Sequence, residues 1–142
     1  MKNAVDDAVK GFCSNIIGLS VQEGKYVGNQ LYGAAIALYQ NGIENQWYLF
    51  FKKPTLNEFS KALLFEENLN EDDLDDLVKE VANMIIGSAK VSLETANRNH
   101  DYKIGVPDFL GHVQNPSTLK LEEILLYKIK NRTFMLGRRI EN

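Results

Sequence analysis

Apolar residues recur at helical spacing in two segments of the chain, and both patterns predict amphipathic helices. The first segment covers residues 3–18, with Gly18 as a candidate stop, and its stripe consists of Val5, Ala8, Val9, Phe12 and Ile16. The second covers about residues 71–96, with Asn70 as a candidate N-cap, and its stripe consists of Leu74, Leu77, Val78, Val81, Ile85, Ala89 and Ser92. We therefore expect two long helices, each with one face packed against another layer of the protein.

Shorter apolar runs predict strands over residues 19–27, 32–39, 46–52, 102–106, 119–130 and 133–139. The signal is weakest for residues 19–27 and strongest for residues 46–52. Polar residues that include Asn41-Gly42 separate the second run from the third, which predicts a hairpin whose loop is longer than a two-residue turn. A turn at Asn131-Arg132 is expected to join the last two strands.

Two further segments interrupt the strand pattern. Thr55-Leu56-Asn57-Glu58 has the form of a capping box, which predicts a short helix from there to about Leu64, after Pro54 has ended the third strand. Pro107 ends the fourth strand, and residues 108–117 are expected to form an irregular loop. The predicted order of elements is α-β-β-β-α-α-β-β-β.

This order contains nearly the same unit twice, and the sequence supports an internal repeat. Residues 3–18 align with residues 72–87 without gaps, and seven of the 16 positions are identical, where about one would be expected by chance. The identities include Asp and Lys as well as apolar residues, so amphipathic periodicity alone does not explain them. We interpret the chain as a single α+β domain, residues 1–142, with two α-β-β-β halves related by a pseudo-twofold axis. They would form one antiparallel sheet with the two long helices packed on one face.

Composition narrows the class of protein. The length of 142 residues fits one domain, and 16 Lys and Arg residues against 19 Asp and Glu residues are too balanced for a general nucleic-acid binder. Cys13 is the only cysteine in the sequence, so an internal disulfide is excluded. Because Cys13 lies on the apolar side of a predicted helix, we interpret it as a small core residue and not as a nucleophile. His100 and His112 have no partner at metal-ligand spacing. The N-terminus lacks the apolar region of a secretory signal, and no apolar run approaches the roughly 20 residues of a membrane span. We expect a cytoplasmic protein.

Seven of the acidic residues lie between Glu66 and Asp76, where the second long helix is predicted to begin. Acidic side chains stabilise the positive end of a helix dipole, which accounts for their position. A calcium-binding loop counted from Asn68 would need glycine at its sixth position and glutamate at its twelfth, but these are Asp73 and Lys79. The acidic run is therefore interpreted as a helix start, and no metal site is predicted.

Four residues of the second helix, Asp76, Glu80, Asn83 and Gly87, lie opposite its apolar stripe, within roughly 60° of one another. Glu80 and Asn83 are three positions apart, so their side chains are neighbours on the helix surface. Asparagine is a mediocre helix former, and a glycine inside a helix costs about 1 kcal/mol relative to alanine. Two unfavourable residues on one exposed strip indicate a surface that another macromolecule approaches closely. An ordinary solvated helix face is the alternative.

The sequence around these residues resembles the CheC/CheX/FliY family of chemotaxis phosphatases. The shared pattern is an acidic or small polar residue (Asp76), three others, Glu80, two others and Asn83, followed by an apolar helix segment that contains Gly87. A bare Glu-x-x-Asn occurs three times in the chain. Only this copy has the acidic residue, the apolar helix and the glycine around it.

Two other parts of the chain bear on the resemblance. Val106-Pro107, followed by Gly111, resembles the strand-end proline and glycine of the family. In the first copy of the repeat, Gly11 and Ser14 stand where the second copy has Glu and Asn, so the resemblance implies one site per chain. The size, the duplicated architecture and the single intact motif are most similar to the CheX members of the family.

The resemblance implies that the protein removes phosphate from the aspartyl phosphate of a CheY-type response regulator. Asn83 would orient the attacking water, since an amide both donates and accepts hydrogen bonds and carries no charge that repels phosphoryl oxygens. Glu80 would pair with a lysine of the regulator, and Asp76 and Gly87 would contact the regulator. The protein would need no cofactor of its own, because the regulator holds the Mg²⁺. It would form a homodimer through its sheet edges.

Two alternatives are compatible with the sequence. The same fold could serve as a non-catalytic binding module that docks a response regulator or a flagellar-switch partner without accelerating dephosphorylation. The chain could also be an α/β domain unrelated to chemotaxis, in which case two symmetry-related helices on one sheet would not be expected.

Overall fold

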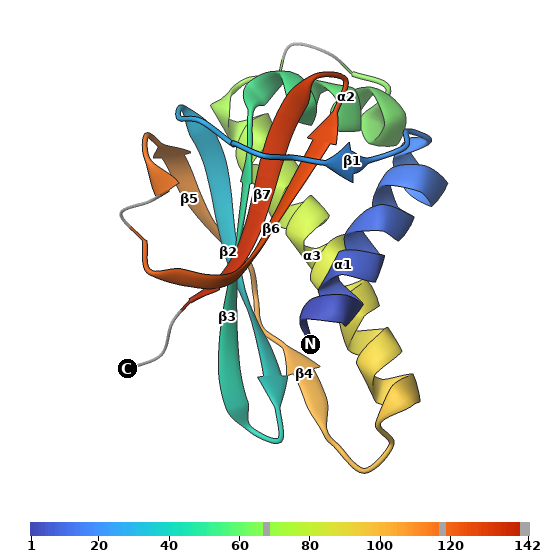
Figure 1. Ribbon diagram of the computed structural model, residues 1–142. Helices are drawn as coiled ribbons and strands as arrows, with labels where there is room; N and C mark the ends of the chain where they lie inside the picture. The colour runs from blue at the N-terminus through green and yellow to red at the C-terminus, as the bar shows by residue number, and fades with distance from the viewer. Residues whose placement is uncertain (67–68, 117–118, 140–142) are drawn as a thin grey trace.

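The computed structural model describes residues 1–66, 69–116 and 119–139, which form two layers (Figure 1). One layer is an antiparallel sheet. The helices α1 (Lys2–Gly11) and α3 (Glu71–Ala96) lie side by side on one face of that sheet, and the shorter α2 (Lys53–Leu64) crosses one end of it. Among the described helices, none is both long enough and apolar enough to cross a lipid bilayer.

The sheet has seven strands, and the two halves of the chain interleave in it. The strands are β1 (Gln22–Glu23), β2 (Leu31–Gln40), β3 (Ile43–Phe51), β4 (Tyr102–Ile104), β5 (Asp108–Val113), β6 (Leu121–Ile129) and β7 (Arg132–Arg139). Their order is β1-β6-β7-β3-β2-β4, and β5 pairs with the other end of β2. Exchanging β1, β2 and β3 for β4, β6 and β7 gives the same order read from the opposite edge. The predicted α+β class with two halves in one antiparallel sheet is thus confirmed, while an internal duplication stays a prediction.

Both long hairpins close with two-residue turns. Gln40 pairs with Ile43 in the first hairpin, and Ile129 pairs with Arg132 in the second. The angle φ is positive at all four turn residues, Asn41 (51°), Gly42 (80°), Lys130 (48°) and Asn131 (66°). Type I′ turns have this conformation and match the twist of antiparallel strands. The prediction of a longer first loop was therefore wrong, and the second turn lies one residue earlier than predicted.

The start of α2 also differs from the prediction. The helix begins at Lys53, with Pro54 in its first turn, where a missing N–H is tolerated. Thr55 therefore lies inside the helix, and its buried hydroxyl has no hydrogen-bond partner among the described residues, so it does not cap the helix. The N-cap of α3 was predicted correctly, because Asn70 Oδ1 accepts a hydrogen bond from Asp73 N at 2.9 Å.

The strands at the two sheet edges depart most from the sequence pattern. Only Gln22–Glu23 of the weak apolar run at residues 19–27 forms a strand. Residues 108–113 form β5 where an irregular loop was predicted, because their main chain pairs with β2. Within β5, Gly111 has a φ of 70° and pairs with Gly33, next to a shift in register. An irregular strand at a sheet edge, formed by main-chain pairing, need not show the alternation of apolar and polar residues from which strands are predicted.

The first helix ends in a π-helical segment that the apolar pattern did not predict. Helix α1 continues directly into η1 (Phe12–Ile17), and Gly18 ends it with a φ of 83°. A π-turn holds more residues than an α-turn, so the side chains that follow it are rotated around the helix axis. As a result Ile17 is buried, whereas Ile16, which the predicted stripe included, is 45% exposed.

The main core lies between the sheet and the helices. Its aromatic side chains pack edge to face or tilted against one another and include Phe12, Phe51, Phe59 and Phe134. Cys13 is buried in the same core, as predicted. Burial raises the pKa of its thiol to about 12, so the thiol stays protonated at neutral pH and is a poor nucleophile.

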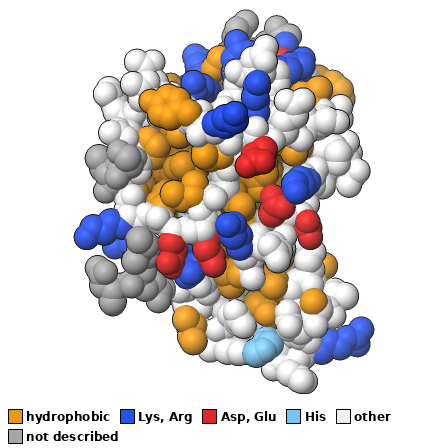
Figure 2. Space-filling model, viewed as in Figure 1, with side chains coloured by type: hydrophobic (Ala, Val, Ile, Leu, Met, Phe, Trp, Pro, Cys, Tyr) orange, Lys and Arg blue, Asp and Glu red, His pale blue; other side chains and the backbone are white. Residues whose placement is uncertain are grey.

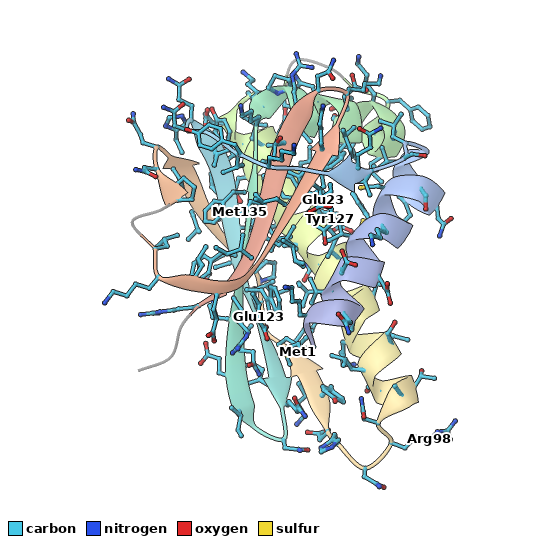
Figure 3. The ribbon with its side chains drawn as sticks, in the orientation of Figure 1. Met1, Glu23, Arg98, Glu123, Tyr127 and Met135 are labelled. Atoms are coloured by element: carbon cyan, nitrogen blue, oxygen red, sulfur yellow. The ribbon has the colours of Figure 1, made fainter. Side chains whose placement is uncertain are left out.

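A smaller apolar cluster lies on the other face of the sheet. It consists of Val27, Leu31, Phe50 and Met135, and Figure 2 shows hydrophobic side chains gathered on this side of the molecule. Tyr127 and Met135 lie on opposite sides of the β6–β7 hairpin (Figure 3). The hydroxyl of Tyr127 donates a hydrogen bond to Asp6 Oδ1 at 2.6 Å and thereby links β6 to α1.

Candidate functional site

Helix α3 carries the candidate site. One of its sides is apolar and buried, and the opposite side is polar and accessible to solvent. The buried side consists of Leu74, Leu77, Val78, Val81, Ala82, Ile85, Ile86, Ala89 and Leu93. It is wider than the predicted stripe, since α3 packs against α1 as well as against the sheet. Toward its C-terminal end Leu93 is buried and Ser92 is exposed. The prediction that Ser92 faces the sheet was therefore wrong.

The opposite side of α3 brings together the four residues singled out in the sequence. Asp76 and Glu80 are exposed, and Asn83 and Gly87 are half-buried. We call Asp76, Glu80, Asn83 and Gly87 the motif strip. The structure therefore places all four on one accessible surface, as the spacing predicted, while their roles stay predictions.

Among the residues that the structure describes, the polar side chains of the motif strip have no hydrogen-bond or ion-pair partner, whereas their charged neighbours do. Within the described part of the chain, Glu80 and Asn83 form no hydrogen bond and no ion pair. Lys79 instead pairs with Asp75 at 2.8 Å, and this hydrogen bond raises the pKa of Lys79. Lys90 pairs with Glu94 at 3.3 Å. A carboxylate and an amide are thus left available to a partner, with no hydrogen bond or ion pair to another described residue to break first.

Gly87 has no internal structural role that requires a glycine. It lies within α3, and the nearest atom to a Cβ built there, apart from its own helix, would be Ile104 Cδ1 at 3.9 Å. That is an ordinary van der Waals contact, so alanine would fit. The absence of a side chain keeps this part of the motif strip flat, which suits the close approach of another molecule.

In the predicted repeat, the first copy (residues 3–18) lacks the chemistry of the second (residues 72–87). Gly11 has no side chain where α3 has Glu80, and the hydroxyl of Ser14 donates a hydrogen bond to the main-chain oxygen of Lys10 at 2.9 Å. The first copy therefore presents neither a carboxylate nor an amide at these positions. The two copies do share one ion pair, since Asp6 bonds Lys10 at 2.9 Å just as Asp75 bonds Lys79.

An apolar groove of about 420 Å³ adjoins the motif strip and was missed from the sequence. It lies between the end of α2 and the first half of α3 and is lined by Leu63, Leu64, Asp76, Leu77, Glu80 and Met84. The only signal in the sequence is the pair Leu63-Leu64 at the end of a predicted helix. Nothing in that pair indicates which part of α3 it will meet.

The described residues show no other chemical centre of this kind. No group of three or more His, Cys, Asp or Glu side chains among them is arranged to hold a metal ion. Both histidines are exposed; His100 Nδ1 lies 2.7 Å from Asn41 Nδ2, and the ring of His112 packs edge-on against Tyr32. Val106-Pro107 connects β4 to β5, and Val106 is 84% exposed.

Two interleaved halves, each with one long helix and three corresponding strands, with β5 additional in the second half and a Glu-x-x-Asn strip on one of the two helices, define a domain of the chemotaxis phosphatase class. The chain belongs to the CheX family, because the family model described as "Chemotaxis phosphatase CheX" matches residues 32–129. The resemblance noted in the sequence is thereby confirmed. No curated protein shows significant sequence similarity to the chain.

Solved structures show the same fold. The chemotaxis protein CheX from Vibrio vulnificus is 16% identical and superposes with a TM-score of 0.78, covering 98% of this chain and 95% of that one. CheX from Desulfovibrio desulfuricans is 20% identical, with a TM-score of 0.72 and coverage of 98% and 97%. A chain of the CheX–CheY–BeF3–Mg²⁺ complex from Borrelia burgdorferi is 16% identical, with a TM-score of 0.68 and coverage of 99% and 97%.

Proposed function

We propose that this protein dephosphorylates the aspartyl phosphate of a CheY-type response regulator and that the motif strip of α3 docks against the phosphorylated site. The observation that carries the proposal is the pair Glu80 and Asn83, which are adjacent on the exposed face of a helix in a CheX-family fold and have no partner among the described residues. The Borrelia burgdorferi complex supports the partner, because in it a CheX protein is bound to CheY with BeF3 and Mg²⁺.

Asn83 is the residue we assign to the chemistry. An acyl phosphate is already labile, and the regulator contributes Mg²⁺ and charge stabilisation, so the phosphatase has only to place a water in line with the phosphorus. The amide of Asn83 can accept a hydrogen bond from that water and donate another without repelling the phosphoryl oxygens. Its half-buried position restricts the side chain and lowers the entropic cost of holding the water.

Glu80 is assigned to alignment. Its exposed carboxylate would form an ion pair with a lysine of the regulator and hold Asn83 in register with the phosphate. Asp76 lies one turn before Glu80 and extends the negative surface, while Gly87 lies one turn after Asn83 and lets the partner approach the helix. No metal or cofactor of its own is required, since the Mg²⁺ belongs to the regulator.

The proposal is tested by phosphate release from a phosphorylated CheY-type regulator with and without the protein. We expect acceleration by the wild type, loss of acceleration in Asn83→Ala and a large reduction in Glu80→Gln. Two exposed residues serve as controls: Asn15, in η1, and Glu94, in the third Glu-x-x-Asn of the chain. Asn15→Ala and Glu94→Gln should retain wild-type activity.

The same assay separates the catalytic proposal from the non-catalytic one. A binding module would bind the regulator without accelerating phosphate release, and all variants would then release phosphate at the rate of the regulator alone.

A protein with this partner would act in the cytoplasm.

We also propose a homodimer joined through sheet edges. The proposal is supported by β1 and β4, which end the strand order on either side. Light scattering coupled to size exclusion tests it, and a monomer at all concentrations would contradict it.

A further inference from the structure

The groove beside the motif strip has an apolar floor and a half-open rim. Leu77 is 3% exposed at its base, and Leu63 and Met84 are half-buried and pack against the main core. Leu64, at the end of α2, is 49% exposed. The volume of about 420 Å³ lies toward the lower end of the roughly 300–1,000 Å³ that is typical of binding pockets. The groove is therefore a preformed site for an apolar group.

The exposed apolar surface continues beyond the groove. Phe65 directly follows Leu64 at the end of α2, is 91% exposed and has a φ of 57°. A left-handed backbone conformation is uncommon for a residue other than glycine. Two consecutive large apolar side chains in contact with water, next to a groove and beside the motif strip, are typical of an interaction surface.

One side of the groove is acidic. Asp76 and Glu80 both line it, and neither forms an ion pair with another described residue. An occupant must therefore combine an apolar side chain with a positively charged neighbour. A second copy of this surface would bring two more carboxylates against these two, so a symmetric contact between copies through the groove is disfavoured by charge.

We infer that the groove receives an apolar side chain of the response regulator, one that neighbours the lysine paired with Glu80. The inference rests on the proposed function and adds a second determinant to it. Glu80 recognises the charge and the α2–α3 groove recognises the apolar residue beside it. Leu64 then acts as a positioning residue, which determines how tightly the regulator binds and not how fast the docked phosphate is hydrolysed.

Leu64→Ser tests this role, because Leu64 is at the rim and its replacement leaves the core intact. Binding is measured by titrating the full chain with a CheY-type regulator charged with beryllofluoride and Mg²⁺, and phosphate release is measured in parallel. We expect Leu64→Ser to weaken binding and to raise KM by at least fivefold, with kcat within twofold of the wild type. Leu64→Met, which keeps an apolar side chain, should bind like the wild type.

Ile43→Ser is the matched control. Ile43 is 63% exposed in the turn region of the β2–β3 hairpin, at the end of the molecule opposite α2 (Figure 1), and its replacement should change neither quantity. Unchanged binding by Leu64→Ser, or an equal loss in Ile43→Ser, would overturn the inference, as would a wild type that does not bind the charged regulator. If the wild type binds without releasing phosphate, the proposed catalysis fails, and the loss of affinity in Leu64→Ser still decides whether the groove takes part in docking.

Discussion

Gly18 and Gly87 occupy the same position when residues 3–18 are aligned with residues 72–87, but only Gly18 has a left-handed backbone. With a φ of 83°, Gly18 ends the first helix, whereas Gly87 lies inside α3 with room for a Cβ. The fold therefore needs the first glycine and not the second. A glycine that weakens a long helix without serving the fold is consistent with a contact outside the chain.

We expect Gly87→Ala to raise the free energy of unfolding by about 0.5–1 kcal/mol, because alanine is the better helix former. Gly18→Ala should instead lower it by about 1 kcal/mol or more, since alanine strains a left-handed position. Urea denaturation measures both. Gly87→Ala should also bind the regulator–beryllofluoride complex several-fold more weakly. A destabilised Gly87→Ala would show that the glycine serves the fold.

The contact between Tyr127 and Asp6 makes stability depend on pH. Burial raises the pKa of the Asp6 carboxyl, but hydrogen bonds from Tyr127 and Lys10 outweigh it and hold the pKa below its ordinary value. A carboxyl whose pKa is lower in the folded state stabilises the fold above its unfolded pKa of about 4, and this stabilisation is lost as the pH falls through the folded pKa. Tyr127→Phe should therefore lower the free energy of unfolding by about 1 kcal/mol at neutral pH, and by less under acidic conditions.

Urea titrations of the wild type and Tyr127→Phe at neutral pH and below the folded pKa of Asp6, well under about pH 4, measure this difference. Tyr26→Phe is the control, because Tyr26 is 80% exposed. An equal cost of Tyr127→Phe at both pH values would show that the hydrogen bond does not depend on the charge of Asp6.

The two tight turns each contain an asparagine, at the first turn position in one (Asn41) and at the second in the other (Asn131), and their contributions to stability can be compared. Asn41 and Asn131 both have a positive φ in a type I′ turn. Asn41 Oδ1 also accepts a hydrogen bond from Asp101 N at 2.8 Å, and its Nδ2 lies 2.7 Å from His100 Nδ1. Asn41→Ala should therefore cost about 1–2 kcal/mol more in the free energy of unfolding than Asn131→Ala. Equal losses by urea denaturation would mean that only the backbone conformation matters.

Charge reversal tests the alignment role of Glu80. Glu80→Lys should weaken binding of the regulator–beryllofluoride complex at least tenfold at low salt, because the new lysine would face the regulator's lysine, which has the same charge. The difference should shrink at high salt, where exposed charges are screened. Glu94→Lys, on the same helix, loses only an exposed pair with Lys90, which contributes little. A Glu94→Lys variant as weak as Glu80→Lys would indicate a non-specific effect of charge.

The motif strip could be predicted because one helix carries all of it. Within a helix, spacing alone determines which side chains share a face, so Glu80 and Asn83 were placed together without knowledge of the rest of the fold. The buried side of α3 is wider than predicted, because α3 packs against α1 as well as against the sheet, and it does not include Ser92. The exposed position of Ile16 could not be predicted, since it follows from a π-helical segment.

Features that depend on contacts between two distant segments could not be predicted from the sequence. The groove needs Leu63 and Leu64 of α2 to meet Leu77 and Met84 of α3, and no periodicity in either helix specifies that contact. Strand β5 forms through main-chain pairing with β2, and the pattern of its own side chains does not predict a strand. Such features depend on tertiary packing, which overrides local pattern.

The most direct test of the central claim is single-turnover phosphate release from a phosphorylated CheY-type regulator held with saturating protein. Asn83→Ala should bind the beryllofluoride-charged regulator as tightly as the wild type and yet slow the release by about 100-fold, because the attacking water is no longer positioned. Release by Asn83→Ala at the wild-type rate, with binding intact, would contradict the assignment of Asn83 and the account built on it.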